Sequence, residues 1–575
     1  MRFTRPKVLG VLPFIVVSLI PIFALAQELF LLDVPDSLRL KVVYPADGDT
    51  VSFDRVRYAG SALPSAKVWV QGSETRVYPS GAFVGLVDLE PGVNILSFTV
   101  RDSLGVLSDS LRMFRTPGRR SLPERPTSVN TSEVRPREDV HISPGDVLEV
   151  EFHASPAGRA SFSIDKIVED FHMEEASPAN AGGLQGIYRG SVIIPPRKEY
   201  SPKPVEFKFR GKDGRELKFK SDGKVHVLSE LFPLVAVTTD SLTVVRTEPG
   251  GEIWMELPVG IKMQITGERE GLKMVKLAED VVGYVASNSL RMLPVGSPLP
   301  QASIGAIGAL QDANWVQLRI NISKKIPFRI QQFVEPAALE VVFYRARQAP
   351  QWIMYPEDDE TVGTIQWRQE SASEIVLRVE LNQEQQWGFH GRYVGRQFRL
   401  YIRRAPRFSN LADSLLNGLT IVVDAGHGGE FEGAVSATGL LEKDVNLKFA
   451  NHVATLLEAE GANVVRTRMQ DTTVTLQKRL AIARDTNSHI FVSLHNNSIS
   501  PATNPVRPRG TSTYYTVPQS AAIARKVYQR LLTLGVQPFG RVVSTYFVTR
   551  QTSLLSFLVE GLFMTHPEDE MLLMD

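Results

Sequence analysis

Hydrophobic and polar residues alternate along most of the chain from Leu38 to Pro406. Clear examples are Leu38–Tyr44, Trp315–Asn321 and Glu374–Glu380, and Gly, Pro, Asp and Asn separate such runs. A period of two places alternate side chains on opposite faces of a strand, and these turn residues end strands. The pattern predicts a series of all-β modules through this part of the chain.

The first two predicted modules are β-sandwiches, at 38–115 and 138–229. The order of strands and turns in 38–115 loosely resembles that of bacterial immunoglobulin-like modules. Residues 116–137 are rich in Pro, Arg, Ser and Thr and have no hydrophobic periodicity, so we interpret them as a linker.

Two smaller β modules are predicted to follow. Residues 232–294 contain the turn Leu257-Pro-Val-Gly260 and the late strand Gly283-Tyr-Val285, an order that resembles bacterial SH3 domains. Such a barrel either binds the cell wall or serves as a spacer. Residues 301–406 end in Gly388–Arg403, which resembles the end of an AMIN-type β domain; the alternative is a third structural sandwich.

The periodicity changes in the last part of the chain, residues 417–575. Short apolar runs at Leu419–Gly426, Ala462–Arg468, His489–His495 and Ser556–Phe563 alternate with helical patterns, the clearest at Glu442–Gly461. Alternation of this kind favours an α/β domain with a mostly parallel sheet. The predicted fold class is therefore multidomain, with all-β modules followed by a C-terminal α/β domain.

Composition excludes several classes of function. The chain has 575 residues, 43% hydrophobic and 22% charged, with a net charge of +1, so it lacks the basic excess typical of nucleic-acid binding. It contains no cysteine, which excludes disulfides, thiolate metal sites and cysteine nucleophiles. Any metal must therefore be bound by His and carboxylate side chains.

The N-terminus has the layout of a secretory signal peptide, at residues 1–26. Arg2, Arg5 and Lys7 precede an uncharged apolar run that closes on Ala24-Leu-Ala26. The alternative is an uncleaved membrane anchor. In either case we expect an exported protein of the periplasm or cell envelope, with no membrane span once the signal is cleaved.

Three possible metal ligands lie at the expected rim of the C-terminal sheet. His427 and His495 follow strands, and Glu442 occupies the first turn of a helix. Sites in open α/β sheets form beyond the carboxyl ends of the strands. Two imidazoles and one carboxylate make a catalytic zinc set that leaves a fourth position for water. Viewed with its helix alone, Glu442 is better explained by the helix dipole.

A fourth candidate, Glu560, lies among apolar residues of the last predicted strand. Carboxylates are rarely buried unless they are paired or functional. In apolar surroundings, Glu560 would have a raised pKa and could move protons for a metal-activated water. The alternative is a structural ion pair with Arg550.

These pieces resemble the zinc-dependent N-acetylmuramoyl-L-alanine amidases of the Amidase_3 type over residues 419–571. The resemblance is carried by six ordered motifs: Asp424–Gly429, Gly439–Leu447, Arg466–Arg468 with Asp471, Ser493–Asn497, Gly510–Tyr515, and Leu558–Glu560 with Pro567–Glu570. It implies Zn²⁺ on His427, Glu442 and His495, and Glu560 as the catalytic carboxylate. The sequence departs from the family after Glu560, where His566 replaces an Asn and is interpreted as a loop residue. We also expect the family's C-terminal helix to be missing after Asp575.

The resemblance implies a peptidoglycan hydrolase that cuts the amide between N-acetylmuramic acid and L-alanine of the stem peptide. The expected roles are wall remodelling or daughter-cell separation, with peptidoglycan and possibly a protein activator as partners. Two alternatives stay open: a non-catalytic wall-binding or regulatory protein, and a zinc peptidase acting within the stem peptide.

Overall fold

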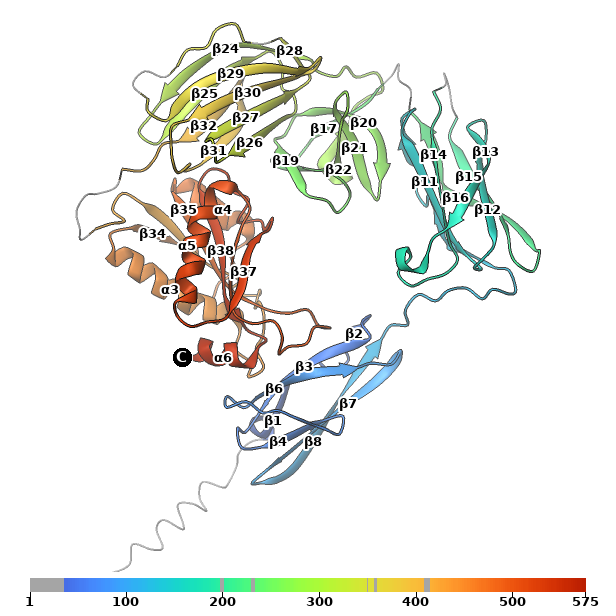
Figure 1. Ribbon diagram of the computed structural model, residues 1–575, viewed down its shortest axis with the longest axis vertical. Coiled ribbons are helices and arrows are strands. Elements are labelled where there is room, and N and C mark those ends of the chain that lie inside the picture. The colour runs from blue at the N-terminus through green and yellow to red at the C-terminus, as the bar shows by residue number, and fades with distance from the viewer. Residues whose placement is uncertain (1–35, 197–200, 229–232, 349, 356–358, 408–413) are drawn as a thin grey trace, which may run out of the picture.

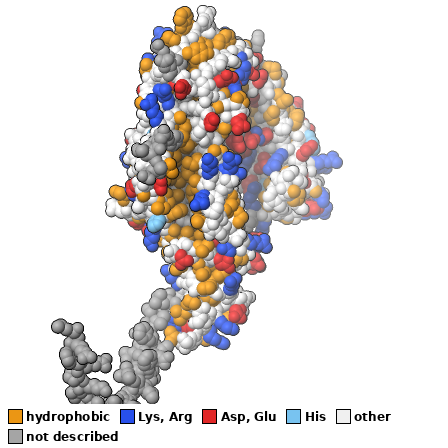
Figure 2. Space-filling view, turned by 60° about the vertical axis from the view of Figure 1, so that its left-hand side comes forward, with side chains coloured by type: hydrophobic (Ala, Val, Ile, Leu, Met, Phe, Trp, Pro, Cys, Tyr) orange, Lys and Arg blue, Asp and Glu red, His pale blue; other side chains and the backbone are white. Residues whose placement is uncertain are grey.

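The computed structural model describes residues 36–196, 201–228, 233–348, 350–355, 359–407 and 414–575 (Figure 1). The predicted signal peptide, 1–26, lies outside these residues. Among the helices described, none combines the length and the apolarity needed to cross a membrane. On the face shown in Figure 2, Lys and Arg side chains are interspersed with Asp and Glu, in keeping with the small net charge.

The first β unit consists of two sheets packed face to face. The sheets have the orders β1-β3-β6 and β2-β8-β7-β4-β5, and their core includes Val56, Phe83 and Phe98. Its elements are α2 (Asp36–Arg39), β1 (Leu40–Tyr44), β2 (Thr50–Val51), β3 (Arg55–Ala62), β4 (Lys67–Val70), β5 (Ser73–Thr75), β6 (Ala82–Asp88), β7 (Gly92–Asp102) and β8 (Gly105–Arg115).

The next two β units share one 15-stranded sheet path. The first comprises β9 (Val129–Arg135), β10 (Val140–Ile142), β11 (Val147–Ala154), β12 (Arg159–Ile164), β13 (Val168–Glu175), η1 (Pro178–Asn180), β14 (Ile187–Ile193), β15 (Lys203–Arg210) and β16 (Glu216–Val227). The second comprises β17 (Leu234–Thr238), β18 (Thr243–Arg246), β19 (Ile253–Leu257), β20 (Lys262–Arg269), β21 (Leu272–Ala278), β22 (Val281–Ala286), η2 (Ser287–Ser289) and β23 (Leu290–Met292). Strand β10 joins them, because it pairs with both β16 and β20.

The fourth β unit again has two sheets, ordered β28-β24-β25-β32-β31 and β26-β27-β30-β29. Its strands are β24 (Ala302–Gln311), β25 (Trp315–Ile322), β26 (Phe328–Phe333), β27 (Ala338–Tyr344), β28 (Ala346–Gln348), β29 (Val362–Ser371), β30 (Glu374–Leu381), β31 (Phe389–Val394) and β32 (Gln397–Arg403). Its core is continuous with that of the preceding unit.

The C-terminal domain places helices against a six-stranded sheet of order β34-β33-β35-β38-β36-β37. Its elements are β33 (Thr420–Ala425), α3 (Glu442–Ala459), β34 (Asn463–Arg466), α4 (Leu476–Asp485), β35 (Ile490–Asn497), β36 (Thr511–Tyr515), η3 (Pro518–Ser520), α5 (Ala521–Leu532), β37 (Pro538–Val543), β38 (Leu555–Phe563) and α6 (Pro567–Met574). Strands β33, β35 and β38 are parallel neighbours. Their carboxyl ends therefore meet at one edge, where α3 also begins.

The predicted fold class is wrong. About 49% of the structure is strand and 11% is helix, with large sheets throughout. The second and third β units share one sheet instead of standing apart, and in the C-terminal sheet β36 runs antiparallel to β38. The alternating pattern of a strand specifies which face is buried, but it does not specify which edge pairs with which partner or in which direction. Pairings between distant segments are therefore where the sequence prediction failed.

Candidate metal centre

His427 lies two residues beyond β33, in a tight turn. Its backbone has φ +60°, which is uncommon for a residue other than glycine. The buried guanidinium of Arg479 stabilises this turn by donating to the carbonyl oxygens of His427 and Ala425, both at 2.7 Å. In this turn the imidazole points toward the edge of the sheet formed by the carboxyl ends of β33, β35 and β38.

Glu442 is the first residue of α3 and is only 4% exposed. Its Oε2 accepts from the Ala434 N–H at 2.9 Å, and its Oε1 accepts from the Asn446 amide at 3.1 Å and the Asn496 N–H at 3.2 Å. Burial by itself would raise the pKa of Glu442, but the hydrogen bonds and charges of His427 and His495 outweigh burial. The pKa is well below its usual value, and the carboxylate stays charged.

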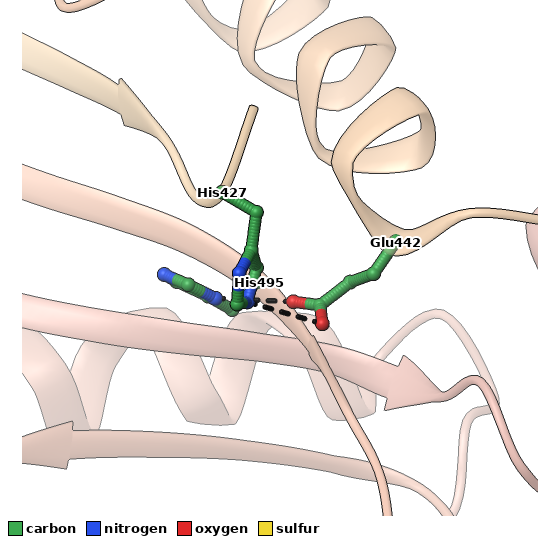
Figure 3. Close-up of side chains that lie close together, drawn as sticks. All are labelled: His427, Glu442 and His495. Atoms are coloured by element: carbon green, nitrogen blue, oxygen red, sulfur yellow. Dashed lines mark hydrogen bonds and ion pairs between the residues drawn. The ribbon is translucent and has the colours of Figure 1, made fainter. Parts of the chain in front are cut away.

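His495 lies on β35 with its ring over Gly426. Its Nδ1 lies 3.0 Å from Glu442 Oε1, and His427 Nε2 lies 3.2 Å from Glu442 Oε2 (Figure 3). A Cβ at position 426 would lie 2.2 Å from the His495 ring, so this position requires glycine. The structure thus brings together the three ligands expected from the sequence.

The donor set fits a metal ion. The ligand atoms of His427, Glu442 and His495 all lie within 4.8 Å of one another. Two ligands bound at about 2.1 Å in a tetrahedral zinc site would be about 3.4 Å apart. The two His–Glu separations of 3.2 and 3.0 Å, each to a different oxygen of Glu442, are close to this value.

Glu560 lines the same pocket and lies beside His495 in the β35–β38 register. Burial, with the nearby charge of Glu442, raises its pKa well above the usual value. Its Oε2 is buried without a hydrogen-bond partner among the described residues. The alternative pair with Arg550 is not formed, because Arg550 donates to Glu256 at 2.8 Å.

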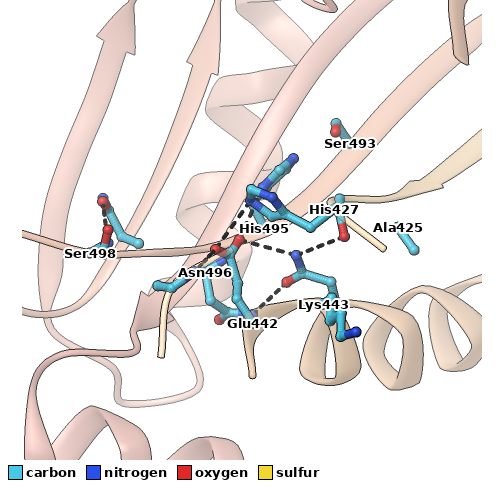
Figure 4. Close-up of polar contacts among 12 residues, drawn as sticks. Ala425, His427, Glu442, Lys443, Ser493, His495, Asn496 and Ser498 are labelled. Atoms are coloured by element: carbon cyan, nitrogen blue, oxygen red, sulfur yellow. Dashed lines mark hydrogen bonds and ion pairs between the residues drawn. The ribbon is translucent and has the colours of Figure 1, made fainter. Parts of the chain in front are cut away.

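The pocket has a volume of about 440 Å³ and opens to solvent. Besides the four residues above, it is lined by Gly433, Ala434, Asn496, Asn497, Ser498 and Tyr546. Figure 4 shows polar contacts around Glu442, His495 and Asn496. The Asn446 side chain donates to the Gly426 carbonyl and to the Glu442 carboxylate, and it accepts from the Asn496 amide.

Several supporting residues were missed at the sequence level. Asp424, Arg468 and Asn496 lay within recognised motifs but were given no role, and Asn446 and Arg479 were not singled out. Arg479 pairs with buried Asp424, and Arg468 donates to the carbonyls of Ala425 and Gly426 at 3.0 Å. A signal for Arg479 exists in the sequence, since it shares one helical face with Leu476, Leu480 and Ala483.

Two other histidines of this domain, His489 and His566, do not belong to the candidate metal set. His489 Nδ1 accepts from the Thr420 N–H at 3.0 Å, and burial lowers its pKa to about 4. His566, expected in a loop, caps α6 by accepting from the Glu568 N–H at 3.2 Å.

Replacing one ligand should remove metal binding without unfolding the domain. We expect His495→Ala to weaken Zn²⁺ binding at least about 100-fold, measured by competition with a chelating dye. His452→Ala, on the exposed side of α3, is the matched control and should bind as the parent does. Unchanged affinity in His495→Ala would contradict this assignment.

Arg479→Met should destabilise the domain, because it leaves the Asp424 carboxylate buried and unpaired. Breaking a buried ion pair costs about 3–5 kcal/mol, which urea unfolding would measure. Arg484→Met changes an exposed arginine of the same helix and should cost less than about 1 kcal/mol. Equal effects of the two variants would show that the buried pair has no special role.

The raised pKa of Glu560 predicts a pH-dependent stability in metal-free buffer. The folded protein keeps the Glu560 proton at pH values above 4.5, the ordinary pKa of glutamate, whereas the unfolded chain loses it. The stability of the fold therefore falls as the pH rises from 4.5 through the raised pKa of Glu560 in the folded protein. Glu560→Gln removes the effect and should be more stable than the parent at pH 7. This gain in stability should vanish near pH 4, as measured by thermal unfolding across the pH range. Glu460→Gln, at an exposed glutamate, is the control and should show no such gain. A gain in Glu560→Gln that does not depend on pH would contradict the prediction.

Comparison with known proteins shows a family match confined to this domain. Residues 421–575 match the family Amidase_3, N-acetylmuramoyl-L-alanine amidase. The amidase LytC of Bacillus subtilis is 34% identical over 179 residues, which cover 30% of this chain and 35% of LytC. The protein YqiI of the same organism is 36% identical over 159 residues, 27% of this chain and 74% of YqiI.

Among solved structures, the amidase AmiC2 of Nostoc punctiforme is 38% identical, with a TM-score of 0.26, and the match covers 27% of this chain and 86% of that one. This chain therefore spans about a third of LytC but most of YqiI and of the AmiC2 structure. Through residues 421–575, the chain belongs to the N-acetylmuramoyl-L-alanine amidase family.

Proposed function

We propose that the protein hydrolyses peptidoglycan at the amide bond between N-acetylmuramic acid and the L-alanine of the stem peptide. The observation that carries this proposal is the convergence of His427, Glu442 and His495 with Glu560 around one open pocket, inside the segment that matches the amidase family.

In this proposal, His427, Glu442 and His495 hold a zinc ion. Two imidazoles with one carboxylate are a common ligand set of catalytic zinc. When bound, zinc supplies Lewis-acid chemistry, which polarises a carbonyl group and makes water more acidic.

Glu560 is the proposed proton carrier. Its carboxylate takes a proton from the attacking water as the C–O bond forms at the lactyl carbonyl. It then donates that proton to the alanine nitrogen as the C–N bond breaks, which yields a lactyl carboxylate and a free amine. Buried surroundings suit this role, because a raised pKa brings the carboxyl closer to the working pH of such an acid and base.

The rest of the chain is consistent with a substrate outside the cytoplasm. We propose export by the N-terminal signal peptide and wall binding by the SH3-like unit at 232–294 and the AMIN-like unit at 301–406. The Staphylococcus aureus protein LytH, which is 34% identical over 163 residues, is named a probable cell wall amidase.

Digestion of purified peptidoglycan tests the proposed reaction. The full chain with Zn²⁺ should release new L-alanine amino termini, identified by mass spectrometry after amine labelling. EDTA should abolish the release, and Glu560→Gln should lower the rate by about 100-fold or more, which is the range for loss of a general acid and base.

The control for this substitution is Glu460→Gln, an exposed carboxylate at the end of α3, which should retain full activity. New amino termini on residues other than L-alanine would identify a peptidase instead. Release that persists in Glu560→Gln would exclude Glu560 as the proton carrier.

A further inference from the structure

The N-terminal sandwich lies against the C-terminal domain next to α6 (Figure 1). Strand β1 pairs with β3 only between Leu40↔Ala62 and Tyr44↔Ala59, so the earlier part of that edge of β3 is open. There the Arg57 N–H donates to the carbonyl of Pro501 at 2.7 Å. Pro501 belongs to the loop that follows β35.

An apolar cluster lies between the two domains. It joins Ala437, from the loop before α3, to side chains of the sandwich, and every member is at most 7% exposed: Ala59, Tyr78, Ala82, Val84 and Ala437. This cluster is separate from the core of the sandwich, into which Phe83 of the same strand points.

The sandwich side of this cluster is unusual for an outer sheet face. Alternate residues of a strand point to opposite faces, and the outer face of a sandwich sheet is normally polar. With Phe83 in the core, Ala82 and Val84 lie on the outer face of β6, yet both are apolar and buried. Contact with the C-terminal domain explains both features, so this face is adapted for docking.

Charged groups surround the cluster and orient the two domains. Lys41 Nζ lies 3.0 Å from the position that a Cβ on Gly439 would occupy, and the guanidinium of Arg76 lies 4.0 Å from the Glu568 carboxylate on α6. The Arg76–Glu568 pair is exposed, so it adds little binding energy and mainly fixes orientation.

The two loops that the sandwich contacts, before α3 and after β35, also contribute residues to the lining of the pocket. Ala437 is three residues beyond Ala434, whose N–H donates to Glu442 Oε2 at 2.9 Å. Pro501 is three residues beyond Ser498, which also lines the pocket. The first loop is also fixed to α6, because the Thr438 N–H donates to buried Glu570 at 2.9 Å.

Docking leaves the pocket open. The side chain of His427 keeps 31% of its surface exposed, and the pocket retains its volume of about 440 Å³. The sandwich therefore does not act as a plug.

We infer that the N-terminal sandwich is an intramolecular clamp, which holds the loops 432–441 and 498–509 in place and so fixes the Glu442 side of the metal centre. The consequence for catalysis rests on the proposed function, whereas the docking and the ordering of the loops do not.

Val84→Arg in the full-length chain tests the clamp, because it places a long charged side chain in the apolar cluster. The amides of residues 432–441 and 498–509 should exchange hydrogen at least about fivefold faster, and small-angle scattering should show a longer particle. Val93→Arg is the matched control, with the same change at a site on β7 that is 65% exposed, and should alter neither readout.

Ala437→Arg approaches the same contact from the C-terminal domain and should reproduce both effects, so misfolding of the sandwich alone cannot mimic the result. A longer particle with unchanged loop exchange in both variants would overturn the clamp. An unchanged particle length in both variants would overturn the docking itself.

The effect on activity separates this inference from the proposed reaction. If the enzyme hydrolyses peptidoglycan as proposed, Val84→Arg should lower kcat/KM about tenfold while Val93→Arg leaves it unchanged. Faster loop exchange with no hydrolysis by any variant, the parent included, would support the clamp and refute the proposed reaction. Faster exchange with unchanged kcat/KM would refute the catalytic consequence.

Discussion

The buried carboxylate of Glu442 is the group on which the rest of the site depends. An ionised carboxylate removed from water is costly unless hydrogen bonds and opposite charges compensate for it. Here the compensation comes from four separate segments: the turn at His427, the loop at Ala434, the helix at Asn446 and the strand end at His495 and Asn496. The convergence of all four segments keeps the carboxylate charged, so the same contacts that stabilise this charge also set the geometry of the candidate metal centre.

The two carboxylates of the pocket, Glu442 and Glu560, have opposite pKa shifts because their surroundings differ. Burial raises the pKa of both, but Glu442 has two imidazoles and three amide donors, whereas Glu560 Oε2 has no hydrogen-bond partner among the described residues. The charge of Glu442 raises the pKa of Glu560 further. One carboxylate therefore stays charged and suits a cation, and the other can hold a proton, although both are the same residue type on the same rim.

Sequence patterns predicted the local elements of the site better than the architecture around it. The apolar runs and helical spacing gave β33, α3, β35 and β38 to within a few residues, and His427, Glu442 and His495 stood out because they flank those elements. The fold class failed, because the pairing of β10 with β20 and the antiparallel pairing of β36 with β38 join segments far apart in sequence. Arg479 was missed for a similar reason: its role depends on carbonyls of a turn more than fifty residues away.

The apolar outer face of β6 links the arrangement of the domains to the order of the pocket loops. Loops that line a pocket lose conformational freedom when they hold a ligand, and this loss weakens binding unless the loops are ordered beforehand. Ala437 and Pro501 are contacted by the sandwich, each three residues from a residue that lines the pocket. A docked sandwich therefore lowers the entropic cost of ordering the Glu442 loop. It does so from outside the pocket, which leaves the opening free for the proposed peptidoglycan substrate.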